Sequence, residues 1–262
     1  MKRGKPPIKT GKAPHGKQIL FGIHACLAAL ENPKRGGHVL FMTQKAFSSM
    51  DSLLQHRIQS VTSPIFVTSE VLDNRLSPSD VHQGLLLEVA PLATLSLEDI
   101  VEGTESPATI ILLDQVTDPH NVGAILRSSA VFGAKALVMP LHHSAEINGT
   151  LAKVASGALE HVPVVIVNNL KQAMDYLKTK NFWCVGLDEE GTQELGDFSF
   201  EGNTALVLGA EGKGLRRLTA ESCDVLLRLP TSATFQTLNV SNAAAIALYE
   251  VFHQSTDRRK KR

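Results

Sequence analysis

The chain of 262 residues is long enough for two small domains or for one large domain with an appendage. Its 43% hydrophobic content and a mean hydropathy near zero are typical of an ordinary globular protein. No run approaches the roughly 18–20 apolar residues of a membrane-spanning helix, so a membrane protein of that kind is excluded. The formal net charge is zero, so composition alone gives no argument for a nucleic-acid partner.

Basic residues gather at both ends of the chain. Residues 1–17 hold six Lys or Arg and no acidic residue, and the last five residues are all basic. Such ends can add phosphate contacts, but they are equally common as solubilising segments. Residues 1–17 are predicted to be a disordered arm because they contain almost nothing to bury. No long apolar stretch follows them, so a secretory signal is not expected, whereas a basic organellar presequence stays possible.

The three cysteines, Cys26, Cys184 and Cys223, are scattered and odd in number. They form neither a disulfide framework nor a zinc-binding pattern, so no metal site is expected. We predict that they are small buried apolar residues of a cytoplasmic protein.

A small α/β domain is predicted over residues 18–90. Residues 23–30 have helical composition, and the apolar runs 38–42, 64–67 and 84–89 are typical of strands. Residues 91–107 hold acids, Ser and Thr with few large apolar groups, so we predict a linker there.

From residue 108 onward, apolar runs recur at regular intervals. Six strands are predicted, at 109–113, 136–139, 162–167, 182–187, 204–208 and 225–229. Helical stretches separate several of them, which predicts a mostly parallel sheet covered by helices. This second domain is predicted over residues 108–254, followed by a basic tail over 255–262.

Three polar segments lie within the second domain, and the first runs from Asp114 to Arg127. It follows a predicted strand and opens a helix, where ligands of α/β sheets gather. Asn121 is a good helix-capping residue. Arg127 lies off the packing stripe of the helix, and it can converge with Asn121 only if Asn121 belongs to the turn. A plain capped helix with a surface arginine would fit the same residues.

The second segment, Leu206 to Leu215, places three glycines after a buried strand. Glycines let the backbone turn tightly and let a ligand approach its amides. The GxxGxG spacing fits neither a P-loop nor a dinucleotide-binding fingerprint. Glu211 in this turn needs a partner, and Arg127 is one candidate, although such turns are usually only connections.

The third segment runs from Leu229 to Ala244. A strand ends at Pro230, a polar loop follows, and a helix is predicted to start near Asn239, with apolar residues at i, i+3, i+4 and i+7. A capped helix on the sheet explains the helix but not the long polar loop before it.

Together, these segments resemble motifs 1, 2 and 3 of the SpoU (TrmH) group within the SPOUT superfamily of RNA methyltransferases. They occur in the family order and separations, and the resemblance covers essentially all of residues 108–254. The run Ala155 to Val164 also resembles the family. The N-terminal domain, with residues 22–25 and 82–84, resembles the L30e-like RNA-binding domain of the branch that methylates guanosine in 23S (large-subunit) rRNA.

This resemblance implies a fold and a function. The fold would be a trefoil-knotted α/β domain that forms a homodimer through the knot region, which periodicity does not predict. The function would be transfer of a methyl group from S-adenosyl-L-methionine to a ribose 2′-hydroxyl, with a guanosine of 23S rRNA as the expected target. The partner would be RNA, with no metal and no membrane.

The resemblance also implies two sets of site residues: Gly209, Leu229 and Leu238 for the cofactor, and Asn121, Arg127, Glu211 and Asn239 as the polar catalytic set. Glu211 would orient Arg127 and Asn121 through charge-assisted hydrogen bonds. Arginine side chains stay protonated at neutral pH, which makes arginine an unusual base. Arg127 would therefore either take the proton with help from a substrate phosphate, or hold that phosphate while another group takes the proton.

Three positions depart from the family pattern. Thr237 stands where the family commonly has serine, Ala233 where it often has glycine, and Thr231 where it often has methionine. These departures concern nucleotide preference more than methyl transfer.

Three other functions fit parts of the sequence. A tRNA 2′-O-methyltransferase would share the site, and a non-catalytic RNA-binding ribosome assembly factor would share the scaffold. The four intact catalytic residues argue against the assembly factor. A nucleotide-dependent oxidoreductase would share the alternating pattern, but the chain has no early GxGxxG.

Overall fold

The computed structural model describes residues 16–260 except 233, 235 and 236, so the basic arm falls almost entirely outside the described residues. The described chain forms two compact units. One contains residues 94–145 and 162–260, and the other contains residues 16–93 and 146–161.

The smaller unit is built on a four-stranded sheet with the order β1-β4-β2-β3. Its strands are β1 (Gln18–Phe21), β2 (Val39–Met42), β3 (Ile65–Phe66) and β4 (Leu85–Val89). β4 runs antiparallel to β1 and β2, and β3 runs parallel to β2. Its helices are α1 (Ile23–Glu31), α2 (Gln44–Ser48), α3 (Ser52–Val61), α4 (Ser69–Asp73) and α7 (Gly149–Ala155), with a short 3-10 turn at Ala158–Glu160. The predicted α/β character and the strands near 40, 65 and 87 are confirmed.

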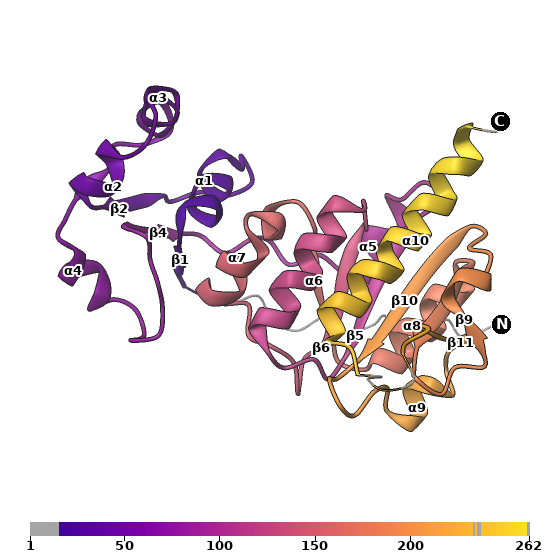
Figure 1. The fold of residues 1–262 in the computed structure, drawn as a ribbon. Helices are drawn as coiled ribbons and strands as arrows, with labels where there is room; N and C mark the ends of the chain where they lie inside the picture. The colour runs from indigo at the N-terminus through magenta and orange to yellow at the C-terminus, as the bar shows by residue number, and fades with distance from the viewer. Residues whose placement is uncertain (1–15, 233, 235–236, 261–262) are drawn as a thin grey trace. The chain divides into compact units, whose positions relative to one another are not determined.

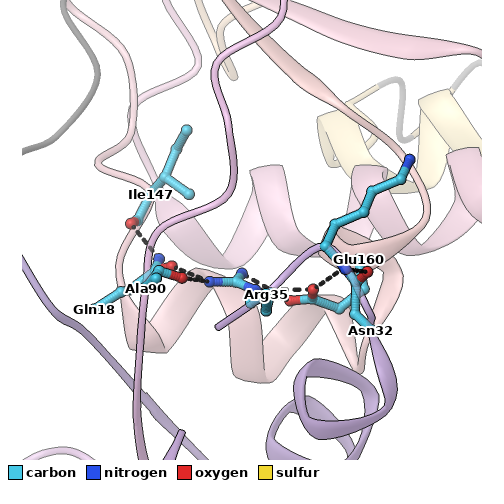
Figure 2. A network of polar contacts seen from close by, with 7 residues as sticks. Gln18, Asn32, Arg35, Ala90, Ile147 and Glu160 are labelled. Atoms are coloured by element: carbon cyan, nitrogen blue, oxygen red, sulfur yellow. Dashed lines mark hydrogen bonds and ion pairs between the residues drawn. The ribbon is translucent and has the colours of Figure 1, made fainter. Parts of the chain in front are cut away.

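A buried ion pair holds the segment 146–161 within this smaller unit (Figure 2). The guanidinium of Arg35 donates to Glu160 at 2.7–3.0 Å, and the two side chains are only 0% and 3% exposed. Arg35 also donates to Gln18 Oε1 and to the carbonyl of Ala90. Asn32 donates to the second oxygen of Glu160 at 2.7 Å. Both charged groups therefore have the hydrogen bonds that burial demands.

The larger unit contains a seven-stranded sheet with the order β7-β6-β5-β10-β8-β11-β9, and all of its strand pairs are parallel. The strands are β5 (Thr109–Asp114), β6 (Ala136–Pro140), β7 (Val164–Val167), β8 (Phe182–Leu187), β9 (Gln193–Glu194), β10 (Asn203–Gly209) and β11 (Val225–Arg228). The mostly parallel sheet and its six predicted strands are confirmed. The seventh strand, β9, has only two polar residues, so it leaves no apolar run to detect.

Helices cover the sheet of the larger unit. They are α5 (Leu97–Glu102), α6 (Pro119–Val131), α8 (Leu170–Thr179), α9 (Arg217–Ala220) and α10 (Val240–Lys260), with a 3-10 turn at Leu195–Asp197. Figure 1 shows α10 alongside α6 on one face of the sheet, and the two helices are in extensive contact. α8 packs Leu170, Met174 and Leu177 against alternate buried residues of the strands. α10 continues through Lys260, across most of the predicted basic tail.

One helix of the larger unit was not predicted. α5 lies inside the predicted linker, where Ser96 and Asp99 form a capping box and Leu97 is fully buried.

The three cysteines are free; Cys26 and Cys184 are buried, as predicted, whereas Cys223 is only half-buried. Burial raises the pKa of Cys184 and of Cys223 to about 12, so both thiols are neutral near pH 7. No helix in the described part of the chain is long and apolar enough to cross a membrane.

Candidate functional site

The first polar segment forms the turn between β5 and α6. Asp118 caps α6, because its carboxylate accepts from the backbone N–H of His120 at 2.8 Å, and Pro119 follows at the first helical position. The expectation that Asn121 caps this helix is wrong. Asn121 lies in the first turn of α6 and is 9% exposed.

The second polar segment is a closed turn after β10. Ala210 and Gly214 exchange two backbone hydrogen bonds of 3.1 and 2.9 Å. A Cβ on Gly209 would lie 2.1 Å from the carbonyl carbon of Gly214. Glycine at 209 is therefore needed because the chain packs against itself there, which is a different reason from the close ligand approach expected from the sequence.

A buried carboxylate fixes the end of this turn. Asp114, the last residue of β5, is 1% exposed and accepts from the backbone N–H of Arg216 at 2.9 Å and from its guanidinium at 2.6–2.7 Å. This ion pair joins the first residue of the first polar segment to the residue that follows the second segment, 102 residues further along the chain. Sequence reasoning missed Arg216, and the only signal for it was an acidic residue at the end of a buried strand.

The third polar segment leads into α10 through Asn239. The side-chain oxygen of Asn239 accepts from the backbone N–H of Ser241 at 2.9 Å, so the predicted helix start near Asn239 is confirmed. Its side-chain nitrogen donates to Asn121 Oδ1 at 3.0 Å and to Glu211 Oε2 at 3.2 Å. Asn121 Nδ2 donates to the same Glu211 oxygen at 3.2 Å.

Asn121, Glu211 and Asn239 thus form what we call the amide–carboxylate cluster. One residue comes from each polar segment, as the resemblance implied. Two amide groups hold one oxygen of Glu211, while its other oxygen, Oε1, makes no hydrogen bond with the described residues. The cluster therefore presents a fixed hydrogen-bond acceptor at the carboxyl ends of the parallel strands.

Arg127 lies apart from this cluster. Its side chain is exposed on α6 and makes no hydrogen bond or ion pair with the part of the chain that the structure describes. The expected contact between Glu211 and Arg127 is absent from the structure. Glu211 is hydrogen-bonded to Asn121, and Asn121 belongs to the same helix as Arg127 and not to the turn before it. Six residues along a helix rotate a side chain by about 240°, so the two residues face different directions.

The expected cofactor residues stand at the ends of strands or of a loop. Gly209 ends β10, and Leu229 directly follows β11 and is half-buried. Leu238 is 40% exposed and stands two residues before α10. Thr231 and Thr237 are exposed, and Ala233 lies outside the described residues.

A cavity of about 340 Å³ opens beside the amide–carboxylate cluster. It is lined by Gln115, Val116, Thr117, Asp118, Asn121, His143, Ala210, Glu211 and Lys213. None of the three expected cofactor residues lines it. Sequence reasoning did not single out Gln115, Asp118, His143 or Lys213, although each follows a predicted strand. Among the described residues, no group of three or more side chains could hold a metal ion.

Two family models match the chain. Residues 108–249 match the SpoU rRNA Methylase family, and residues 19–95 match the family described as RNA 2′-O ribose methyltransferase substrate binding. A relative from Ralstonia nicotianae, named 23S rRNA (guanosine-2′-O-)-methyltransferase RlmB, is 37% identical over 239 residues, which cover 90% of this chain and 96% of that protein. The Escherichia coli protein of the same name is 37% identical over 241 residues, 90% of this chain and 98% of that one.

Solved structures have the same fold. AviRb from Streptomyces viridochromogenes, a SpoU methyltransferase crystallised with the cofactor AdoMet, superposes with a TM-score of 0.78 at 23% identity, over 92% of this chain and 91% of that one. A structure of an RNA 2′-O ribose methyltransferase superposes with a TM-score of 0.75 at 21% identity, over 92% and 89% of the two chains. The family-model match covers more than half of the chain and the relatives align over nearly their whole length, so this chain belongs to the SpoU rRNA methylase family.

Proposed function

We propose that this protein transfers a methyl group from S-adenosylmethionine to the ribose 2′-hydroxyl of a guanosine in 23S rRNA. The observation that carries the proposal is the amide–carboxylate cluster, which brings together Asn121, Glu211 and Asn239 from three distant segments. The names of the relatives at 37% identity support the reaction and the target nucleotide.

The residues expected to hold the cofactor have the chemical character that its nucleoside requires. A nucleoside needs apolar contacts and backbone groups, and Leu229 and Leu238 supply a half-buried and a partly exposed apolar side chain. Gly209 keeps the neighbouring turn closed. When bound, S-adenosylmethionine would supply the electrophilic methyl group attached to its sulfonium.

The cluster would position the hydroxyl group that is methylated. A ribose 2′-hydroxyl is a poor nucleophile until its proton is accepted, and positioning at roughly 3–3.5 Å supplies much of the rate enhancement. Glu211 Oε1 is a carboxylate oxygen with no partner among the described residues, so it can accept a hydrogen bond from this hydroxyl. Asn121 and Asn239 would keep the carboxylate in place.

Arg127 would bind a phosphate of the RNA. Its guanidinium is exposed and has no partner within the described chain, which suits a bidentate contact with a phosphate. A guanidinium that stays protonated suits this role better than that of a base. With Arg127 on the phosphate, the amide–carboxylate cluster would accept the proton of the 2′-hydroxyl.

The smaller unit would bind RNA as an L30e-like domain, and the match of residues 19–95 to a substrate-binding family supports this role. We also propose that the larger unit has the trefoil knot of its superfamily and that the protein acts in the cytoplasm, where rRNA is modified.

An exposed apolar patch supports the proposed homodimer. Val131 of α6 and Ile246, Tyr249 and Phe252 of α10 are all exposed. Phe132 packs against Tyr249 and Phe252 with ring centroids 6.0 and 5.9 Å apart, so apolar contacts join α6 and α10 there. Exposed apolar patches of this kind mark protein interfaces. Sedimentation should find a dimer, and Tyr249→Glu with Phe252→Glu should convert it to a monomer; an unchanged dimer would place the interface elsewhere.

The enzymatic proposal is tested by incubating the purified chain with methyl-labelled S-adenosylmethionine and unmodified 23S rRNA. We expect one labelled guanosine, methylated on its ribose, and loss of that methyl group from the rRNA of cells that lack the protein. Binding of RNA without any transfer of label would instead indicate an assembly factor. Transfer to tRNA alone would correct the substrate.

A further inference from the structure

Two residues with unusual backbone conformations line the same cavity. Five described residues other than glycine have a positive φ, and they are Gln83, Gln115, His143, Ser156 and Asn181. Gln115, with φ 61°, and His143, with φ 59°, both line the cavity beside the amide–carboxylate cluster. The left-handed conformation costs a non-glycine residue roughly 1–2 kcal/mol, so glycine would be the more stable choice at both positions.

The chain on either side of each residue is firmly held. Gln115 lies between Asp114, which is buried and paired with Arg216, and Val116, whose carbonyl accepts from the N–H of Ala145 at 3.2 Å. His143 is followed by Ser144, whose hydroxyl donates to the carbonyl of Pro140. Because β5 and β6 are parallel neighbours, the two residues follow adjacent strand ends.

Neither side chain contributes a hydrogen bond to the described fold, and Gln115 is half-buried while His143 is exposed. Gln115 and His143 make no side-chain hydrogen bond with the described residues, although their backbones are fixed. Strained backbone conformations cluster at active and ligand-binding sites, and here two of them line one cavity. The cavity volume of about 340 Å³ falls within the range of pockets for small ligands or single nucleotides.

The lining of the cavity indicates which ligand it takes. Asn121 and Glu211 of the proposed hydroxyl-binding cluster line it, whereas Gly209, Leu229 and Leu238 do not. The occupant is therefore the nucleotide rather than the cofactor. A glutamine carboxamide presents a donor and an acceptor side by side, which matches the edge of a guanine, where O6 accepts and the ring N–H donates; pairing with an adenine would need the carboxamide turned by 180°.

We propose that Gln115 contacts the base edge of the target nucleotide and determines base preference, and that His143 donates to the sugar–phosphate of the same nucleotide. This inference rests on the proposed function. It adds to the reaction a source of specificity that lies outside the seven residues expected from the sequence.

The test uses glycine substitutions in the full-length protein, because glycine adopts the same backbone conformation without strain. Gln115→Gly and His143→Gly should unfold at the same or a higher temperature than the wild type. Methylation of 23S rRNA should fall at least about 10-fold in kcat/KM for each, as expected for the loss of a specific polar contact to a nucleotide. Gln115→Gly should also narrow the preference for guanosine over adenosine at the target position, which a purely structural role would not change.

Asn181→Gly is the matched control, because Asn181 has φ 61° but does not line the cavity. It should leave kcat/KM and base preference unchanged. Calorimetry should find the same S-adenosylmethionine affinity in all variants, and a lost affinity in Gln115→Gly would assign the cavity to the cofactor and overturn the inference.

The outcomes separate this inference from the proposed function. A wild-type protein that methylates no RNA refutes the proposed function itself. A wild-type protein that is active, together with a Gln115→Gly variant of unchanged kcat/KM or unchanged base preference, refutes the base contact alone.

Discussion

The side-chain nitrogen of Asn239 donates to the side-chain oxygen of Asn121 at 3.0 Å, across 118 residues of sequence. The other side-chain atom of Asn239, its oxygen, caps α10 by accepting from the N–H of Ser241. One residue therefore both starts the C-terminal helix and completes the amide–carboxylate cluster. These two functions use different atoms, so they can be separated by mutation.

Asn239→Asp keeps an oxygen for the cap but removes the donors to Asn121 and Glu211. We expect methylation to fall by about 10²-fold or more, comparable to the loss of a preorganised donor in an active site. The cap is retained, so a loss in the free energy of unfolding would come from repulsion between the new carboxylate and that of Glu211, and it should shrink as salt is added. Ser241→Ala, which removes only a hydroxyl donor to Asn239, is the control and should methylate normally. Wild-type activity in Asn239→Asp would show that the cluster has no role in the reaction.

Gly209→Ala should destabilise the larger unit. The new Cβ would lie 2.1 Å from the Gly214 carbonyl carbon, which is backbone and cannot move aside cheaply. We expect a loss of about 1–3 kcal/mol in urea unfolding, together with weaker binding of S-adenosylmethionine by calorimetry. Gly196→Ala is the control, because a Cβ there would meet no atom within 4 Å, and its stability should stay within about 0.5 kcal/mol of the wild type. Equal stability of both variants would contradict the closed turn.

Arg127→Ala should lose methylation, by about 10²-fold or more, while stability and cofactor affinity stay unchanged. Activity should fall because the phosphate loses its contact, and stability should not change because the exposed guanidinium makes no hydrogen bond or ion pair within the described chain. Arg127→Lys should recover little, because a lysine cannot make the bidentate contact. Arg217→Ala, which removes another exposed arginine whose one ion-pair partner among the described residues is Glu221, should retain activity. Near-normal rates in Arg127→Ala would remove this residue from the site.

Arg35→Met should destabilise the smaller unit by about 3–5 kcal/mol, because it leaves the Glu160 carboxylate, only 3% exposed, without its charged partner. Replacing both residues by methionine should cost less than the single change. The exposed pair Lys171–Asp175 offers the comparison, and Lys171→Ala should cost only about 0.3–0.5 kcal/mol. Urea unfolding, with hydrogen exchange measured over residues 146–161, would follow the effect. A cost below about 1 kcal/mol for Arg35→Met would contradict a buried ion pair.

The sheet of the larger unit could be predicted because buried parallel strands are continuous apolar runs, as in β5 and β10. β9, with two polar residues, has no such run, and α5 was hidden by the acids and serine that in fact cap it. The capping of α6 by Asp118 was missed because Asn121 is an equally good capping residue by type.

The site could be predicted only in part. Asn121, Glu211 and Asn239 were grouped by family resemblance, and their hydrogen bonds join segments that local periodicity cannot relate. The pairing of Asp114 with Arg216 and the strained conformations of Gln115 and His143 depend on how distant turns pack, so no pattern in the sequence indicated them. Asn121 and Arg127 were expected to converge only if Asn121 lay in the turn before α6. Because α6 begins at Pro119, both residues belong to the helix, and the expected contact between Arg127 and Glu211 is not made.

The burial of Glu160 beside Arg35 has a consequence for how this architecture can be divided or recombined. The segment 146–161 is encoded between two strands of the larger unit, β6 and β7, but it folds with residues 16–93. A gene fragment that ends near residue 93 would therefore encode the smaller unit without the carboxylate that neutralises its buried arginine. Exchange of the smaller unit between relatives would have to carry both stretches of sequence, and a simple fusion at the boundary would yield a mismatched chimera.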